Sequence, residues 1–198
     1  MVFMKNPVKG KVKTRLASTL GDEKALEIYK FILGHTARVV SETQQCDKAI
    51  FYSDFVDHDD LWNDTSPQKF LQSGKDLGER MSNAFDFAFG NGYDKVVVIG
   101  TDCLDLNSET IEEGFRNLQN DDIVIGPAVD GGYYLLGMKR LYKNLFENVP
   151  WSTESVFTNT VELITESHLN YHLLPVFRDM DTEEDLYFSH DFLNKKQI

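Results

Sequence analysis

The sequence predicts an α/β fold in which a mainly parallel sheet lies between two layers of helices. Short apolar runs alternate along the chain with longer segments whose apolar residues repeat at helical spacing. One run, Val96–Ile99, is apolar throughout, which is typical of a strand buried on both faces of a parallel sheet. It leads into Gly100 and Asp102, and open sheets of this class bind ligands beyond the carboxyl ends of their strands. We therefore expect a single domain over residues 1–198, built as a three-layer α/β/α sandwich.

The first half of the chain contains two segments with clear helical periodicity. Asp22 is expected to cap the first, and the second presents one face of small, sulfur-containing and aromatic side chains. In order, the predicted elements are a strand at Met1–Met4, the helix after Asp22 with Ala25, Ile28, Tyr29, Ile32 and Leu33 on one face, strands at Ala49–Tyr52 and Phe70–Leu71, a helix at Leu77–Phe89 with Met81, Ala84, Phe85 and Ala88 on one face, and the strand Val96–Ile99.

The second half continues the alternation of strands and helices. Three glutamates fall in the first half of a helix expected from Ser108, where carboxylates interact favourably with the helix dipole. The predicted elements are a helix at Ser108–Leu118, strands at Ile123–Ile125 and Tyr133–Met138, a helix at Ser152–Glu166, a strand at His172–Phe177 and a closing helix at Thr182–Leu193.

Composition narrows the possible partners and compartments. The chain has 20 Lys and Arg residues against 32 Asp and Glu residues, a net charge of −12, which argues against a nucleic-acid or anionic-membrane partner. Two cysteines, Cys46 and Cys103, lack metal-ligand spacing, as do the five histidines. Cys103 is expected to be either a reactive thiol or a small buried filler. No stretch is apolar enough for a membrane span and no signal peptide is apparent, so we expect a cytoplasmic protein. The sequence does not indicate its oligomeric state.

Asp102 is the first candidate for chemistry. A carboxylate directly after a buried strand is well placed to hold a hard cation such as Mg²⁺ through oxygen. Two structural roles compete with this interpretation, because Asp102 could instead cap the helix expected from Ser108 or shape the turn before it.

A cationic loop follows the first strand. Five cations fall within the eleven residues from Lys5 to Arg15 of an otherwise acidic chain, and Gly10 lets the backbone approach a ligand closely. Lys and Arg side chains together with loop amides can surround phosphate oxygens, although the loop lacks the P-loop pattern. The position of the loop at the ligand end of the sheet favours phosphate binding over a merely solvated basic segment.

Two further segments reach the same edge of the predicted sheet. The Asp130-Gly131-Gly132-Tyr133 sequence links two strands and is either a simple turn or a loop whose backbone lines a substrate pocket. Asp179 and Asp181 lie two residues apart, so in an extended backbone both side chains point the same way. Asp181 could also cap the last helix, and the cap and metal roles could be divided between the two carboxylates.

These segments resemble a known family. The sequence is similar to the bacterial glycosyltransferase-like family associated with radical-SAM and selenodomain proteins, which is part of the nucleotide-diphospho-sugar transferase superfamily with the type A glycosyltransferase fold. The matching stretches run in order along nearly the whole chain and are Phe3–Pro7, Gly10–Leu16, Gln72–Met81, Gly100–Asp102, Gly126–Gly137, Trp151–Thr153 and Asp179–Thr182. Related sequences usually carry Pro where Leu104 stands, and this departure removes no candidate ligand.

The resemblance implies a nucleotide-diphospho-sugar transferase-like domain over residues 1–198 that uses a divalent cation, Mg²⁺ or Mn²⁺. Metal ligands would be Asp102 with Asp179 or Asp181, and the catalytic residues would be Lys13, Arg15, Asp102 and Asp130, the last as the base. Nucleotide would be bound by Lys5, Gly10, Lys13, Thr14, Arg15, Gln72, Gly74 and Thr101. The acceptor side would be lined by Asp130, Gly131, Gly132, Tyr133, Trp151 and Thr153.

The resemblance therefore implies a metal-dependent transferase whose partners are a nucleotide or nucleotide-sugar and a small-molecule acceptor. The leading expectation is glycosyl transfer from a nucleoside-diphosphate sugar. The alternative is a nucleotidyltransferase that joins a nucleoside monophosphate from a triphosphate to a small phosphorylated substrate with release of pyrophosphate, because the Lys13–Leu16 loop also resembles triphosphate-gripping loops of phospholactate guanylyltransferases. A non-catalytic nucleotide-binding regulator is the expectation from another class.

Overall fold

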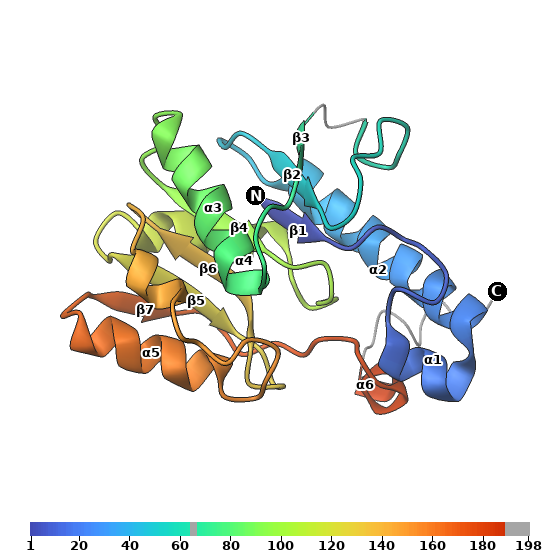
Figure 1. Ribbon diagram of the computed structural model, residues 1–198. Helices are drawn as coiled ribbons and strands as arrows, with labels where there is room; N and C mark the ends of the chain where they lie inside the picture. The colour runs from blue at the N-terminus through green and yellow to red at the C-terminus, as the bar shows by residue number, and fades with distance from the viewer. Residues whose placement is uncertain (64–66, 189–198) are drawn as a thin grey trace.

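A seven-stranded sheet organises the chain, and helices lie on both sides of it (Figure 1). The computed structural model describes residues 1–63 and 67–188. The strands are β1 (Val2–Met4), β2 (Ala49–Tyr52), β3 (Gln68–Leu71), β4 (Val96–Ile99), β5 (Ile123–Pro127), β6 (Tyr133–Met138) and β7 (Tyr171–Leu173), and they lie in the order β3-β2-β1-β4-β6-β5-β7. β6 runs antiparallel to β4 and β5, and the remaining neighbours pair in parallel. The predicted mainly parallel α/β sandwich is confirmed.

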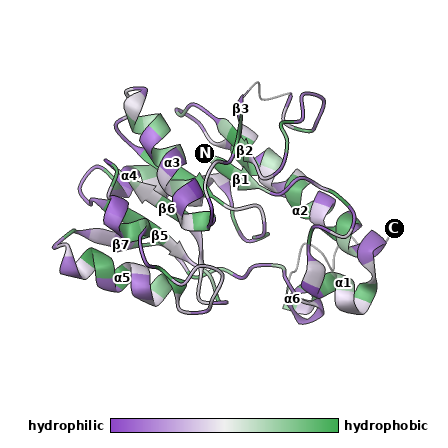
Figure 2. Cartoon of the chain, viewed as in Figure 1, coloured by the Kyte–Doolittle hydropathy of each residue, from purple (hydrophilic) through white to green (hydrophobic). Residues whose placement is uncertain are grey.

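The helices divide between the two faces of the sheet. They are α1 (Thr14–Leu20), α2 (Asp22–Glu42), α3 (Leu77–Gly90), α4 (Ser108–Asn117), the 3₁₀ helix η2 (Lys143–Phe146), α5 (Val156–Glu166) and α6 (Glu183–Phe188). Alternate residues of β1 show the division, because Val2 and Met4 pack in one core cluster with α2 and α4, whereas Phe3 packs in another with α3 and α5. Hydrophobic and hydrophilic residues alternate along α2 and α5, as expected for helices with one buried face (Figure 2).

Most predicted elements form where the sequence places them, and the exceptions have local causes. Asp22 is the first residue of α2 rather than its cap, because Gly21 with φ 81° separates α1 from α2 and occupies the cap position. α1 itself is absent from the sequence prediction. α5 begins at Val156 instead of Ser152, whose φ of 64° is incompatible with a helix.

Two predictions near the end of the chain also need adjustment. β7 ends at Leu173 instead of continuing to Phe177, because Pro175 has no N–H to donate to the ladder. A single bridge between Ala128 and Phe177 resumes the pairing beyond it. The predicted closing helix is present as α6, and its last predicted residues, 189–193, lie outside the described part of the chain.

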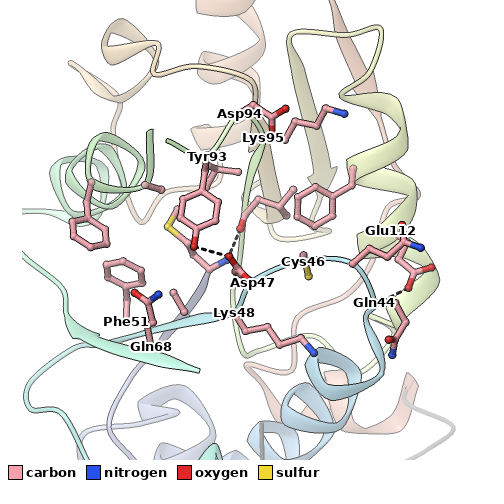
Figure 3. A pocket seen from close by; sticks show the side chains of 18 of the residues that line it. Gln44, Cys46, Asp47, Lys48, Phe51, Gln68, Tyr93, Asp94, Lys95 and Glu112 are labelled. Atoms are coloured by element: carbon pink, nitrogen blue, oxygen red, sulfur yellow. Dashed lines mark hydrogen bonds between the residues drawn. The ribbon is translucent and has the colours of Figure 1, made fainter. Parts of the chain in front are cut away.

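The two edges of the sheet differ in chemistry. At the amino ends of β1, β2 and β4 the surface has a concavity of about 1010 Å³. It is lined by apolar residues such as Phe51 and by side chains of both charges, and Tyr93 donates a hydrogen bond to Asp47 there at 2.8 Å (Figure 3). The polar motifs of the sequence lie at the opposite, carboxyl edge.

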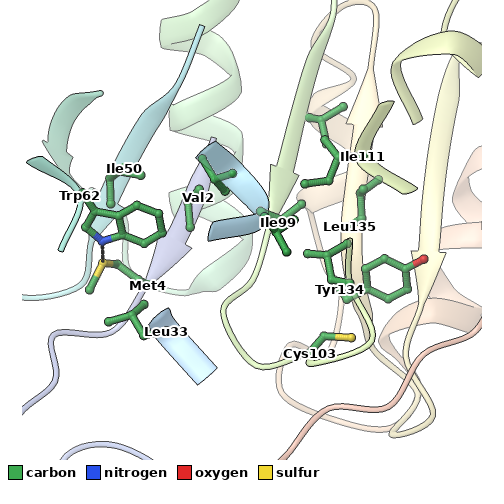
Figure 4. Close-up of a cluster of buried hydrophobic side chains, with 14 of the residues drawn as sticks. Val2, Met4, Leu33, Ile50, Trp62, Ile99, Cys103, Ile111, Tyr134 and Leu135 are labelled. Carbon is green, nitrogen blue, oxygen red and sulfur yellow. Dashed lines mark hydrogen bonds between the residues drawn. The ribbon is translucent and has the colours of Figure 1, made fainter. Parts of the chain in front are cut away.

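The larger core cluster extends to that carboxyl edge (Figure 4). Met4 and Trp62 are buried at the end of β1, where the indole Nε1 donates to the Met4 sulfur at 3.2 Å. Cys103 lies beyond the end of β4 and is 3% exposed. Burial, followed by the charge of Asp179, raises the pKa of its thiol to about 12, so Cys103 is a buried filler instead of a reactive thiol.

A third, smaller apolar cluster holds α1 and α6 together beside the carboxyl edge. It joins Leu16 of α1 and Ile28 and Ile32 of α2 to Leu104, Met180 and Leu186. Figure 1 shows α6 next to α1, far from the neighbouring helix α5 in the chain. Burying Met180 and Leu186 there brings the end of the chain against the loop that follows β1, which places the last predicted motif next to the first.

Candidate functional site

Four loops that are distant in the sequence meet at the carboxyl edge of the sheet. The segment after β7 runs beside the segment after β4, because Cys103 and Asp179 form an antiparallel bridge and Met180 N donates to the Asp102 carbonyl at 2.8 Å. Val129 N, in the loop after β5, donates to the Phe177 carbonyl at 2.9 Å. The carboxylates Asp102, Asp130, Asp179 and Asp181 are thus carried by connected backbone segments.

Lys13 enters this carboxylate group from the loop after β1. It adopts a left-handed conformation with φ 47° and ψ 47° at the start of α1, and its side chain is 3% exposed. The ammonium Nζ lies 2.5 Å from Asp102 Oδ1 and donates to Asp181 Oδ1 at 2.8 Å. Burial opposes the charged form of Lys13, but the two carboxylates outweigh it and raise its pKa. Lys13 is therefore a permanently charged, buried cation between two carboxylates.

Arg15 adds a second cation on the solvent side. Its Nη1 lies 3.9 Å from Asp181 Oδ2, and its side chain is 69% exposed. Two other cations of the loop point elsewhere, because Lys9 pairs with Glu23 at 2.6 Å and Lys11 lies 4.0 Å from Asp54. Two of the five loop cations therefore interact with the carboxylate group in the described contacts.

Asp179 has the most perturbed carboxyl of the group. Burial raises its pKa first, the charges of Asp102 and Asp130 raise it further, and Lys13 opposes them, with the result at about 8. The carboxyl of Asp179 therefore binds a proton at neutral pH when no further cation is present. The shift therefore reflects burial first and the neighbouring carboxylates second.

Tyr29 fastens the start of the cationic loop to the end of β4. Its hydroxyl donates to the Lys5 carbonyl at 2.8 Å, accepts from Lys5 N at 3.1 Å and lies 3.2 Å from the Thr101 hydroxyl. Thr101 is buried, so its side chain supports the loop from inside, whereas the Lys5 side chain is exposed. Sequence periodicity identified Tyr29 as a core residue of α2. It did not reveal that the Tyr29 hydroxyl links the cationic loop to the end of β4.

A capping box holds the segment that carries Asp181. Asp185 Oδ2 accepts from Thr182 N and Thr182 Oγ1, both at 2.8 Å, and from Asp181 N at 3.1 Å. Asp185 Oδ1 accepts from Arg178 Nη1 at 3.0 Å. The predicted cap, Asp181, is therefore wrong by one residue: Thr182 and Asp185 form the box, which leaves the Asp181 carboxylate directed at Lys13. The T-x-x-D spacing was the signal that could have identified Asp185.

Asp102 is likewise not a helix cap. Asn107 caps α4, its side chain accepting from Thr110 N at 2.9 Å. The carboxylate of Asp102 is 44% exposed and free to meet a ligand from the solvent side, while its Oδ1 faces Lys13. The structural alternative of helix capping is thereby removed.

Gln72 and Gly74 lie after β3, at the same edge. Both amide protons of Gln72 are used inside the fold, since Nε2 donates to the Met4 carbonyl at 3.1 Å and to the Phe51 carbonyl at 2.9 Å. Gly74 has φ 146°, and a Cβ there would lie 2.6 Å from Arg80 N. The Gln72 side chain therefore holds the ends of β1 and β2 together, and Gly74 permits a tight loop beside α3.

The Asp130–Tyr133 loop is held by backbone contacts. Asp130 is exposed, and its Oδ1 accepts from Gly132 N at 2.9 Å. Gly131 has φ 88°, and a Cβ would lie 1.9 Å from the Glu154 carbonyl oxygen. The Tyr133 hydroxyl is buried and its ring packs edge-on against Trp151 at 6.5 Å. Of these candidates, Asp130 is the side chain that the loop presents to solvent near the carboxylate group.

The remaining candidates lie at the periphery. Gly10 has φ 77° in an exposed part of the loop, and Thr14 is the exposed first residue of α1. Trp151 is half-buried against Gly78, where a Cβ would lie 2.1 Å from the indole nitrogen. Thr153 is exposed and its hydroxyl donates to the Pro150 carbonyl at 2.7 Å. Trp151 thus packs against α3, and Thr153 shapes the turn before α5.

The site has suitable donors for a hard cation but no preformed cage. Across residues 1–63 and 67–188, no three Asp, Glu, His or Cys side chains group closely enough to hold a metal ion. Asp102 and Asp181 nevertheless direct one oxygen each at a single point, which the Lys13 ammonium takes. Mg²⁺ is commonly held by one or two carboxylates together with substrate phosphates, so these residues fit such an ion once Lys13 moves aside.

Solved structures resemble the chain over nearly its whole length. A "putative nucleotide-diphospho-sugar transferase" from Desulfovibrio desulfuricans G20 is 31% identical, with a TM-score of 0.85 over 99% of this chain and 93% of that one. A 4-diphosphocytidyl-2C-methyl-D-erythritol synthase from Anaerococcus prevotii DSM 20548 shares the fold at 12% identity, with a TM-score of 0.60 over 98% and 95% of the two chains. A CMP:2-keto-3-deoxy-manno-octonic acid synthetase complexed with CTP shares it at 7% identity, with a TM-score of 0.57 over 99% and 98%.

The sequence was also compared with curated proteins and with protein-family models. No curated protein matches the chain. None of the helices in the described residues is long and apolar enough to cross a membrane. A family model described as "Uncharacterized protein conserved in bacteria (DUF2064)" matches residues 36–153, which is more than half of the chain. The chain belongs to the bacterial protein family DUF2064.

Proposed function

We propose that the protein is a metal-dependent transferase that uses a nucleotide-activated donor and transfers a glycosyl group from a nucleoside-diphosphate sugar to a small acceptor. The observation that carries this proposal is the convergence of Lys13, Arg15, Asp102 and Asp181 at the carboxyl edge of the sheet. Two cations beside two carboxylates suit a diphosphate and a divalent ion at the same time. The relative from Desulfovibrio, described as a "putative nucleotide-diphospho-sugar transferase", supports the glycosyl version.

Each residue has a defined task in this reaction. Lys13 and Arg15 would bind the donor diphosphate. Asp102 and Asp181 would hold the divalent cation, which would supply positive charge to stabilise the leaving diphosphate. The bond between the anomeric carbon and the diphosphate oxygen breaks while the acceptor oxygen bonds to that carbon. Asp130, exposed beside the group, accepts the proton of the acceptor hydroxyl.

Nucleotidyl transfer is a second candidate at the same site. In that reaction the acceptor oxygen attacks the α-phosphorus of a nucleoside triphosphate and pyrophosphate leaves. The permanently charged Lys13 supports it, because a triphosphate presents more negative charge to a cation than a diphosphate does. The fold shared with the two cytidine-nucleotide synthetases named above is compatible with either reaction.

A ligand screen separates these reactions. The protein is heated with each nucleoside triphosphate and each nucleoside-diphosphate sugar, with and without Mg²⁺ or Mn²⁺, because a ligand of the native state raises its stability. Stabilisation by a sugar nucleotide, followed by release of the nucleoside diphosphate with an acceptor, supports glycosyl transfer. Stabilisation by one triphosphate, followed by pyrophosphate release, supports nucleotidyl transfer, and binding without turnover indicates a regulator.

Asp102→Asn tests the site itself. The variant removes the carboxylate charge beside Lys13 and is expected to abolish metal-dependent stabilisation by the nucleotide. Asp105→Asn is the matched control, because Asp105 is an exposed carboxylate three residues further along the same segment. Equal behaviour of the two variants would contradict the placement of the site at the end of β4.

A further inference from the structure

Lys13 occupies the point at which Asp102 and Asp181 would hold a cation. We propose that the Lys13 ammonium fills the cation position in the free protein, so that a divalent ion enters only together with nucleotide phosphates, which draw Lys13 away from the two carboxylates. This inference rests on the proposed function. Beyond that function, we infer that the nucleotide-free site excludes a metal ion on its own and binds the metal–polyphosphate complex as one ligand.

The geometry of the ion pairs carries the first step. Nζ lies 2.5 Å from Asp102 Oδ1 and 2.8 Å from Asp181 Oδ1, so one ammonium satisfies both oxygens. A magnesium ion bound to the same oxygens would lie about 2.1 Å from each. The ion and the ammonium would then occupy overlapping positions, and therefore they cannot share the two oxygens.

Burial of Lys13 carries the second step. Its side chain is 3% exposed, whereas those of Asp102 and Asp181 are 44% and 36% exposed. An ammonium displaced from both carboxylates without a new anion would be a buried charge with no partner, which is strongly unfavourable. A metal ion alone supplies no such anion. Phosphate oxygens do, and they also supply ligands that the two carboxylates leave open on the ion.

The charges around Asp102 and Asp181 make the binding of metal and the binding of polyphosphate depend on each other. The exposed Asp130 lies at the same edge as Asp102 and Asp181, and Arg15 approaches Asp181 Oδ2 at 3.9 Å. These carboxylates would repel phosphates that arrive without a metal ion. In the same way, the Lys13 ammonium would repel a metal ion that arrives without phosphates. Binding of the metal alone or of the polyphosphate alone is therefore unfavourable, whereas binding of both together is favourable. Each ligand must then raise the affinity of the site for the other by the same factor.

Direct measurement of Mn²⁺ binding tests this exchange without any assay of activity. Free Mn²⁺ is followed by electron paramagnetic resonance during titration of the nucleotide-free protein. We expect weak binding by the wild type and at least about tenfold tighter binding by Lys13→Met, which frees the Oδ1 atoms of Asp102 and Asp181. Adding Asp102→Asn to Lys13→Met should remove the gain.

The matched control is Lys11→Met, which removes one positive charge from the same loop at an exposed position. It should bind Mn²⁺ as the wild type does, because Lys11 lies at Asp54 and not at the carboxylate group. Equal Mn²⁺ affinity of the wild type and Lys13→Met, or an equal gain in both lysine variants, would overturn the proposal. Circular dichroism shows whether each variant is folded, and Lys13→Gln replaces Lys13→Met if it is not.

A second measurement uses the wild type alone. Its thermal midpoint is recorded with Mn²⁺, with each nucleotide of the screen, and with both together, and the joint shift should exceed the sum of the separate shifts. Stabilisation by Mn²⁺ alone that equals the joint shift would overturn the inference while leaving the proposed function intact. Tight Mn²⁺ binding by Lys13→Met without a response of the wild type to any nucleotide would refute the proposed function, and with it the phosphate-driven step.

Discussion

The carboxylate of Asp185 accepts both the backbone N–H and the hydroxyl of Thr182, each at 2.8 Å. Through this contact α6 fixes the turn that directs Asp181 at Lys13. Asp185 is buried, and these hydrogen bonds, together with that from Arg178, lower its pKa against the effect of burial. Asp185, four positions from Asp181, thus controls where the Asp181 carboxylate points.

Asp185→Ala should therefore lower the free energy of unfolding and weaken metal-dependent nucleotide binding together. The loss of stability should be about 1–3 kcal/mol, since Asp181 N, Thr182 N and the Thr182 hydroxyl lose the buried carboxylate that accepts from them. Chemical denaturation measures it, and Glu184→Ala, at an exposed position of the same helix, is the control. Unchanged nucleotide affinity in a destabilised Asp185→Ala protein would show that α6 stabilises the fold without positioning Asp181.

Gly131→Ala should disrupt the loop that carries Asp130. The new Cβ would lie 1.9 Å from the Glu154 carbonyl oxygen, and φ is 88°. Gly92→Ala separates the two effects, because Gly92 has nearly the same φ, 89°, with nothing within 4 Å of an added Cβ. Gly131→Ala should be less stable than Gly92→Ala by about 1–3 kcal/mol, as measured by denaturation. Equal losses in the two variants would mean that the loop shifts freely away from Glu154.

Arg15→Ala should separate binding from stability. Its ion pair with Asp181 is long and exposed, so the free energy of unfolding should change by less than about 1 kcal/mol. Nucleotide affinity should fall by about 1.5–3 kcal/mol if Arg15 contacts a phosphate. Calorimetric titration with the nucleotide found in the screen measures this loss, and Lys9→Ala is the control because Lys9 pairs with Glu23. A nucleotide affinity of Arg15→Ala equal to that of the wild type would remove Arg15 from the phosphate site.

The raised pKa of Asp179 predicts a pH dependence of stability in the metal-free protein. The folded pKa is about 8 and the ordinary value is 3.8, so between these values the native state binds a proton that the unfolded state releases. The stabilisation is fully present below about pH 4 and is lost as the pH rises through about 8.

Asp179→Asn isolates this group from the other titrating residues, because Asn is neutral at every pH. The thermal midpoint of the variant relative to the wild type should rise with pH in a chelator-containing buffer, most steeply between about pH 5 and pH 7, and should level off above the folded pKa of about 8. A difference between the two proteins that stays constant with pH would show that Asp179 is ionised in the native state throughout.

The sequence by itself determined the strand Val96–Ile99, the mainly parallel sheet around it and the edge at which the candidate site lies. Those features depend on local apolar periodicity and on the rule that strand ends meet at one edge, and both can be recognised without contacts. The motifs around Asp102, Lys13 and Asp181 were therefore expected at the same place, and the structure brings them together there.

Only the tertiary structure decided which side chains of those motifs meet. Lys13, and neither Lys9 nor Lys11, reaches the carboxylates because its left-handed backbone starts a helix that the sequence did not predict. Asp181 is released from capping because Asp185 takes that role. Lys13 and Asp181 are 168 residues apart, and a contact at that separation depends on how α1 and α6 pack together, which no local pattern encodes.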